Sequence, residues 1–213
     1  MSILFLCLYE KEAVEHMYDI DIRNSLKEHL SQEYANSHSI IVDEFKICWG
    51  DARVDIAVVN SNLHGYEIKS DNDTLERLPR QIEFYGKVFD TMSLVCSKKW
   101  LTQSRHLIPN WWGIIVAEYD SNGNIVLHRR RKERLNKKVD IRCVLELTWK
   151  DEALDILASN NAIKGFKSKP RWDIWNKIMD ILDADTIKKS VRERIKERVD
   201  WRTSETLQKL YVD

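Results

Sequence analysis

Short apolar runs separated by polar turns dominate the first two thirds of the chain. Runs of about four to eight residues rich in Val, Ile and aromatic side chains are typical of β-strands. Here they lie near residues 39–48, 53–60, 65–70, 92–97, 111–119 and 124–129. Asn-Gly at positions 122–123 is a strong signal for a tight hairpin turn, so the last two runs are expected to pair.

Helical spacing of apolar residues marks the segments around these runs. Apolar residues recur every four positions in residues 19–30, and further helices are expected over residues 78–90 and 99–106. From about Asp140 onward the spacing is helical. The order α-β-β-β-α-β predicts an α/β fold with a central mixed sheet flanked by helices. An added β-hairpin and a C-terminal helical extension follow this core.

We divide the chain into a core over residues 1–138 and a helical extension over residues 139–213 that packs on the core. The 213 residues, of which 43% are hydrophobic, suffice for a substantial apolar interior. Only 6 Gly and 3 Pro argue against long linkers.

An aspartate and a Glu-x-Lys pair stand out in the predicted strands. Asp55 lies inside an otherwise apolar run. Burying an unpaired carboxylate there costs about several kcal/mol, because the charge loses its hydration. Glu67 and Lys69 follow a short turn and share one face of their strand, because side chains alternate with period 2. Lys69 or a divalent metal could balance Asp55. A salt bridge across the hairpin explains the same charges equally well.

The spacing Asp-x(11)-Glu-x-Lys resembles the signature of the PD-(D/E)XK nuclease superfamily, the fold of many restriction endonucleases. The proline of that signature is replaced by Val54. The stretch from Arg53 to Tyr85 looks more specifically like a branch of largely uncharacterised small bacterial and phage proteins, and the similarity runs from about Asp21 to Trp201. The resemblance implies a restriction-endonuclease-like core.

The resemblance also implies roles for individual residues. Asp55 and Glu67 would bind Mg²⁺ or Mn²⁺, with the backbone carbonyl of Ile68 completing the metal shell. Lys69 would be the catalytic lysine. Gln81 would belong to the catalytic set, with Tyr85 supporting it from the same helix.

That helix and two further acids allow other interpretations. Gln81 and Tyr85 fall on one polar stripe, which is also the pattern of an ordinary exposed helix face. Glu44 shares a strand face with Ile40 and Val42 in simple alternation, and could point to the pocket of Asp55. Asp21 could add an acid from the first helix, although its position suits the outer face of that helix.

The net charge of zero conceals an asymmetry. Residues 1–127 carry 12 Lys and Arg against 19 Asp and Glu, whereas residues 128–213 carry 22 against 15. Within the basic part, the densest cluster begins with Arg129, Arg130, Arg131 and Lys132, and we expect it to contact a phosphate backbone. The interleaved charges of residues 188–202 suit an exposed helix face instead.

Cysteine usage and the N-terminus bear on the compartment. Cys7, Cys48, Cys96 and Cys143 are widely separated and form no Cys-x-x-Cys pair, which favours reduced thiols of a cytoplasmic protein. The apolar residues 3–9 are too short to span a bilayer and lack a basic flank, so no membrane association is expected.

Two tryptophans in the basic part suggest base stacking at first sight. Trp172 and Trp175 lie beside Lys167, Lys169 and Arg171. Their spacing with Ile and Leu residues is helical, so we expect core packing rather than stacking on unpaired bases.

Together these patterns predict a divalent-metal-dependent nuclease, a hydrolase that cuts phosphodiester bonds of DNA, with RNA left open as a substrate. Two other functions stay open: a nucleic-acid-binding module that keeps the fold without cleaving, and a subunit for protein assembly. A homodimer is equally open. Backbone contacts and a metal site carry no information on base identity, so no sequence specificity is predicted.

Overall fold

One mixed β-sheet organises the structure, a computed structural model that describes residues 16–198. Within these residues the sheet has six strands that lie side by side in chain order. They are β1 (Ile40–Ile47), β2 (Ala52–Val59), β3 (Leu63–Lys69), β4 (Thr91–Ser97), β5 (Gly113–Tyr119) and β6 (Ile125–Arg131). The pairs β3–β4 and β4–β5 are parallel, and the others are antiparallel. The apolar residues 3–9 and the basic residues beyond 198 lie outside the described part.

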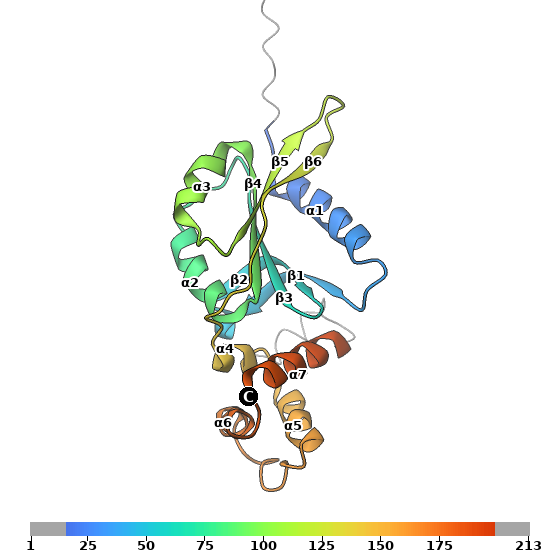
Figure 1. Cartoon of the computed structure of the whole chain (residues 1–213), viewed down its shortest axis with the longest axis vertical. Coiled ribbons are helices and arrows are strands. Elements are labelled where there is room, and N and C mark those ends of the chain that lie inside the picture. Colours follow the sequence, from blue (N-terminus) through green and yellow to red (C-terminus); the bar gives the residue numbers. More distant parts are fainter. Residues whose placement is uncertain (1–15, 199–213) are drawn as a thin grey trace, which may run out of the picture.

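Helices cover both faces of the sheet (Figure 1). Helix α1 (Asp19–Glu33) lies on one face, where Ile22, Leu26 and Leu30 pack against residues of β2, β3 and β5. Helices α2 (Leu78–Val88) and α3 (Leu101–Leu107) lie on the other face. This arrangement confirms the expected α/β class, with the order α-β-β-β-α-β and an added hairpin.

Burial along the strands follows their place in the sheet. Every residue of β3 and β4 is buried, because parallel inner strands are covered on both faces. The edge strand β6 is mostly exposed or half-buried. The expected strand over 111–119 starts only at Gly113, since Trp112 fills the core before the strand begins.

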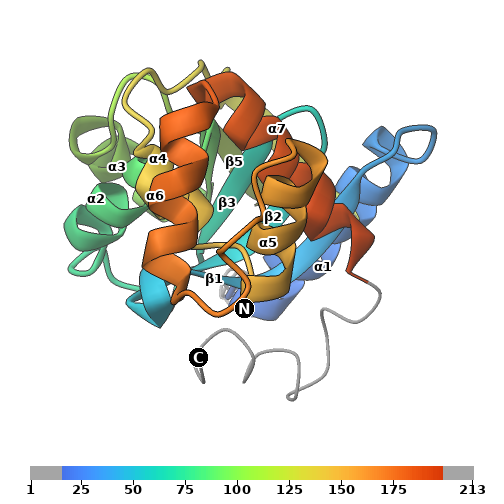
Figure 2. The same cartoon turned by 90° about the horizontal axis from the view of Figure 1, so that it is seen from below.

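The C-terminal part is helical, as expected, and lies across one end of the sheet (Figures 1 and 2). It contains α4 (Ile141–Leu145), α5 (Lys150–Ser159), α6 (Arg171–Ile181) and α7 (Ala184–Glu197). One apolar cluster runs from the sheet into these helices and includes Trp175, which is 1% exposed. Core packing therefore holds for Trp175, whereas Trp172 is 55% exposed.

Ion pairs join α7 to the sheet. The buried carboxylate of Asp90 forms ion pairs with Lys188 at 3.0 Å and Arg192 at 3.3 Å. It also accepts a hydrogen bond from the N–H of Leu63 at 2.9 Å. These two basic side chains are therefore partly buried, and the expectation of a fully solvated helix face is wrong for them. The sequence misleads here because their partner lies about 100 residues away.

The pairing of β1 with β2 is interrupted at Glu44 and Asp55. Regular pairs exist on both sides of this point, but Glu44 has a positive φ of 55° and is not paired there. This conformation is rare outside glycine and turns the strand. Val42 and Phe45 both enter the same apolar cluster although they are three residues apart. The simple alternation that placed Glu44 with Ile40 and Val42 is therefore wrong.

No helix within residues 16–198 is both long and apolar enough to cross a membrane.

Gly65 tests the packing between β3 and β4. A Cβ at this position would overlap Met92 Sδ and lie 3.1 Å from Phe89 Cδ1, and both neighbours are fully buried. We expect Gly65→Ala to lower the free energy of unfolding by about 1–3 kcal/mol in urea denaturation, because overpacking forces the core to shift. Gly86→Ala is the control: its Cβ meets nothing within 4 Å, and the change in α2 should stabilise by about 0.5–1 kcal/mol. Equal effects would contradict this packing.

Candidate active site

Asp55 lies where β2 and β3 separate. The ladder between the two strands ends at the pair of Ile56 with Tyr66. Beyond this pair the side chain of Asp55 takes the place of a backbone acceptor in β2. Its Oδ2 accepts a hydrogen bond from the N–H of Ile68 at 2.7 Å. The N–H and C=O of one strand residue point to the same side. The carbonyl of Ile68 is therefore directed toward the gap that Asp55 occupies.

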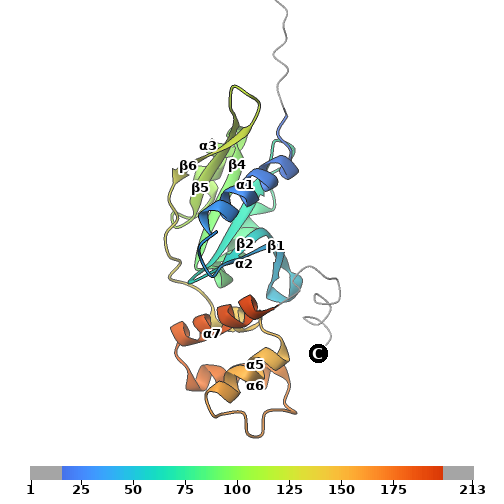
Figure 3. The ribbon, with the colours of Figure 1, turned by 90° about the vertical axis from the view of Figure 1, so that its right-hand side faces the viewer.

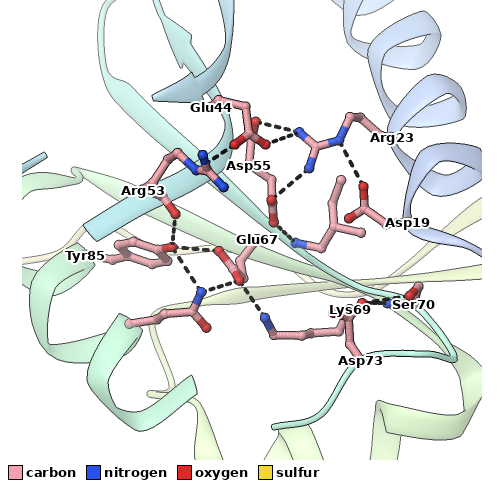
Figure 4. A network of polar contacts seen from close by, with 12 residues as sticks. Asp19, Arg23, Glu44, Arg53, Asp55, Glu67, Lys69, Ser70, Asp73 and Tyr85 are labelled. Atoms are coloured by element: carbon pink, nitrogen blue, oxygen red, sulfur yellow. Dashed lines mark hydrogen bonds and ion pairs between the residues drawn. The ribbon is translucent and has the colours of Figure 1, made fainter. Parts of the chain in front are cut away.

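Arg23 of α1 is the cationic partner of Asp55 (Figure 4). Its Nη2 lies 2.8 Å from Asp55 Oδ1, and its Nη1 donates to the backbone carbonyl of Asp55 at 3.0 Å. The same guanidinium contacts Asp19 at 3.1 Å and Glu44 at 3.2 Å. Lys69, one of the two partners considered for Asp55, pairs with Glu67 instead.

Glu67 is bound on the other side of the gap by residues of β3 and α2. Its Oε1 accepts Lys69 Nζ at 2.6 Å and Gln81 Nε2 at 2.6 Å, and its Oε2 lies 2.7 Å from the hydroxyl of Tyr85. The side chains of Glu67 and Lys69 are each 3% exposed. The structure thus brings together the Glu-x-Lys pair and the two polar residues of α2, and excludes an ordinary exposed stripe for the buried Tyr85.

The charge of Asp55 acts on the carboxylate of Glu67. Burial, followed by the charge of Asp55, raises the pKa of Glu67 to about 7, against the opposing effect of Lys69. Burial also raises the pKa of Asp55 above its ordinary value, although the N–H of Ile68 and the charge of Arg23 act in the opposite direction. Asp55 and Glu67 are therefore close enough to disfavour a second negative charge.

Hydrogen bonding at Tyr85 supports a proton on Glu67. The Tyr85 hydroxyl lies 2.7 Å from both the carbonyl of Arg53 and Glu67 Oε2, yet it has only one proton to donate. Both contacts are satisfied if Glu67 is protonated and donates to Tyr85, which in turn donates to Arg53. This proton arrangement agrees with the raised pKa of Glu67.

The donor set suits a hard divalent cation only in part. Among residues 16–198, no three His, Cys, Asp or Glu side chains are grouped so that they alone could hold a metal ion. Mg²⁺ typically uses one or two carboxylates and completes its shell with water and substrate phosphates, so Asp55, Glu67 and the Ile68 carbonyl fit that chemistry. Gln81 Oε1 is buried and accepts no hydrogen bond from the described residues. It is an acceptor ready for a water molecule at this site.

The weaker acidic candidates lie at the margin of this network. Glu44 is half exposed and bridges Arg23 to Arg53, with 2.6 Å between Glu44 Oε2 and Arg53 Nε. Asp21 accepts the N–H of Tyr18 at 3.2 Å at the start of α1. Asp19, which the sequence interpretation did not select, is the acid of α1 that joins the network through Arg23.

The predicted nucleic-acid contacts lie elsewhere in the sheet. Arg129, Arg130 and Arg131 belong to β6, the edge strand beyond β5, and Lys132 follows it. Arg130 pairs with Glu118 at 2.9 Å, and Arg131 donates to the carbonyls of Trp112 and Pro109. Arg129 and Lys132 are exposed. The structure therefore does not direct this cluster as a unit toward Asp55 and Glu67.

Comparison with known proteins places the chain in a family. The family model described as bacteriophage P4 protein cII matches residues 12–211. The chain belongs to the bacteriophage P4 protein cII family. Protein cII of Enterobacteria phage P4 is 28% identical over 142 residues, which are 64% of this chain and 53% of that protein. The matched part thus spans about half the length of this curated cII relative.

A solved structure of a protein of unknown function from Silicibacter pomeroyi is also similar. It matches 72% of this chain and 100% of its own chain, with 17% sequence identity and a TM-score of 0.42. This similarity is too distant to support a conclusion about the cII-family chain.

The raised pKa of Glu67 predicts a pH-dependent stability. Between the ordinary pKa of 4.5 and about 7, the folded protein binds more protons at Glu67 than the unfolded chain does. The free energy of unfolding must therefore fall as pH rises through this window. Relative to Glu67→Gln, wild type should lose about 2–3 kcal/mol between pH 5 and pH 8 in urea denaturation without metal.

Comparing the two proteins isolates this effect. Burial lowers the pKa of His64 to about 3, which acts in the opposite direction below pH 6.5 but equally in both proteins. Glu83→Gln, which removes an exposed carboxylate of α2, is the control and should leave the steep profile of wild type unchanged. Parallel profiles for wild type and Glu67→Gln would refute the protonation of Glu67.

The role of Arg23 predicts unequal costs for two arginine substitutions. Arg23→Met leaves Asp55 partly buried without its cation and should lower the free energy of unfolding by about 2 kcal/mol or more. Arg53→Met removes only an exposed pair with Glu44 and should cost less than about 1 kcal/mol. Urea denaturation at pH 7 measures both. Similar losses would mean that Arg23 does not neutralise Asp55.

Proposed function

We propose that this protein is a divalent-metal-dependent nuclease that hydrolyses phosphodiester bonds of DNA, using Mg²⁺ or Mn²⁺. The observation that carries the proposal is the convergence of Asp55 and Glu67 at the separation of β2 and β3, with Lys69 bonded to Glu67. The spacing of these three residues resembles the PD-(D/E)XK superfamily, and the observed element order agrees with that resemblance.

The proposed metal ligands are Asp55, Glu67 and the carbonyl of Ile68. A bound divalent cation would polarise the phosphate and lower the pKa of a bound water molecule. Bringing two carboxylates of raised pKa together costs free energy that a cation at this position offsets. For Glu67 to serve as a ligand it must release its proton, so metal affinity should rise as pH increases toward 7 and above.

The remaining residues have positioning and electrostatic roles in this proposal. Gln81 and Tyr85 fix the orientation of the Glu67 carboxylate through the contacts described above. The ammonium of Lys69 lies at the same carboxylate and would stabilise the attacking water or the negative charge that develops on phosphate. Arg23 holds Asp55 in place and could exchange this contact for the phosphate of the substrate.

A second candidate function is a nucleic-acid-binding module that does not cleave. It is favoured by the pairing of both carboxylates with protein cations, Asp55 with Arg23 and Glu67 with Lys69. Such pairs would stabilise the fold without metal. Binding should then persist in the presence of a chelator.

A cytoplasmic location and a DNA partner complete the proposal. Cys48, Cys96 and Cys143 are free thiols, which suits a reducing compartment. A homodimer stays a prediction.

Cleavage assays test the proposal. Purified protein is incubated with labelled duplex DNA, single-stranded DNA and RNA in Mg²⁺ or Mn²⁺, with a parallel EDTA reaction. We expect cleavage of DNA that needs metal and falls at least about 100-fold in Asp55→Asn and Lys69→Met, because both groups act on developing charge.

The matched control is Asp43→Asn, which removes a carboxylate of β1 that pairs with Lys27. It should retain near wild-type cleavage. Cleavage that survives in Asp55→Asn, or that is lost equally in Asp43→Asn, would contradict the proposed site. DNA binding in EDTA without cleavage under any condition would favour the second candidate.

A further inference from the structure

A cleft of about 520 Å³ lies at the end of the sheet next to α7. One wall is the turn after α1, residues 34–39, a second is the β2–β3 turn at residues 60–61, and the third is α7. Figures 1 and 3 show α7 below the sheet, on the side where the turn between α1 and β1 lies. Neither the carboxylates of the candidate active site nor their partners line this cleft.

The α7 wall is predominantly basic. Lys189, Arg192 and Lys196 recur at three and four residues and therefore share one helix face. Lys189 is exposed and forms no ion pair with the described residues, whereas Lys196 contacts Glu193 at 2.8 Å and Arg192 contacts Asp90 at 3.3 Å. Glu193 is the single acid among these lining residues. The wall thus carries an excess of positive charge.

Glu193 lies among the basic residues that line the cleft. Its hydrogen bond with Lys196 lowers the pKa of its carboxyl, burial acts in the opposite direction, and the charges of Lys196, His38 and Lys189 add to the lowering. His38 belongs to the turn after α1, so side chains from two walls of the cleft lie near this one carboxylate.

The opposite wall offers hydrogen-bond donors. Asn60 uses Oδ1 to accept the N–H of Asn62 at 2.8 Å, which leaves its side-chain NH₂ group as a donor. The hydroxyl of Ser61 lies beside it in the same turn. Lysine and arginine on one side and amide and hydroxyl donors on the other are the groups that hold phosphate oxygens.

The cleft and the candidate active site lie at two ends of the same elements. Arg23 and Tyr34 are 11 residues apart on and just beyond α1, or about 16 Å at the helical rise. Asp55 and Asn60 are 5 residues apart along β2 and its turn, or about 17 Å in an extended strand. B-form DNA advances about 3.4 Å per base pair along its axis, so roughly five base steps of a duplex match this separation, and an extended single strand spans it with fewer nucleotides.

We propose that the cleft between α7 and the two turns binds a backbone phosphate of a DNA strand, within about five nucleotides of the phosphate at Asp55 and Glu67. This inference rests on the proposed function, because the strand that fills the cleft is the substrate of that site. The cleft is open and its lining is charged, so it positions the strand without reading bases. The C-terminal helices thereby contribute directly to substrate binding.

Binding without metal tests the cleft separately from cleavage. The probe is fluorescein-labelled single-stranded DNA of about 20 nucleotides, followed by fluorescence anisotropy in EDTA over a series of salt concentrations. Lys189→Glu should weaken binding about tenfold at low salt and reduce the slope of log K against log salt by about 0.7 or more. Lys164→Glu, the same change at an exposed lysine between α5 and α6, is the control and should have a clearly smaller effect.

A variant on the opposite wall makes the test independent of α7. Asn60→Asp keeps the acceptor for the Asn62 N–H but adds a negative charge, so it should also weaken binding, whereas Asn122→Asp in the β5–β6 turn should not.

The outcomes separate this inference from the nuclease proposal. If DNA is cut by wild type and Lys189→Glu binds and cuts like Lys164→Glu, the cleft proposal is overturned and the nuclease stands. If no DNA is cut but Lys189→Glu and Asn60→Asp weaken binding beyond their controls, the cleft stands and the nuclease falls. No binding by wild type would overturn the cleft as a DNA site.

Discussion

The candidate site depends on one hydrogen bond, which the N–H of Ile68 donates to the side chain of Asp55. It substitutes a carboxylate for a backbone partner at the point where β2 and β3 separate, so the ladder can end without leaving a buried N–H unsatisfied. The irregular pairing around Glu44 and Asp55 belongs to the same deviation from a flat sheet. A regular ladder here would close the gap and direct the Ile68 carbonyl into a strand pair instead of toward Asp55.

The consequence is a site whose two carboxylates come from adjacent strands of the sheet and are held by helices on its opposite faces. Asp55 is held by Arg23 from α1, and Glu67 is held by Gln81 and Tyr85 from α2. Each helix supplies groups that offset the desolvation of one carboxylate, yet burial and the charge of Asp55 still raise the pKa of Glu67. Both helices must therefore be packed on the sheet before the site exists, which ties its geometry to the apolar cores on both faces.

Local patterns predicted the parts of this arrangement that local geometry determines. Period 2 placed Glu67 and Lys69 on one face, and the four-residue spacing placed Gln81 beside Tyr85. Arg23 was missed because its partner, Asp55, belongs to another layer, although Asp19, Arg23 and Lys27 form a four-residue stripe that could have indicated it. Glu44 was misplaced because a positive φ at a glutamate has no sequence signal. The contact of Arg129 to Lys132 with DNA stays a prediction, and charge density alone did not indicate that these residues belong to the edge strand of the sheet or follow it.

A crystal structure of the protein with Mn²⁺ and a short single-stranded oligonucleotide carrying a slowly hydrolysed phosphorothioate, with anomalous diffraction recorded for manganese, tests the proposed metal site directly. We predict an anomalous peak bounded by Asp55, Glu67 and the Ile68 carbonyl, with a phosphate oxygen beside Lys69. A structure in which Arg23 and Lys69 keep their contacts to the two carboxylates and manganese binds elsewhere or not at all would contradict it.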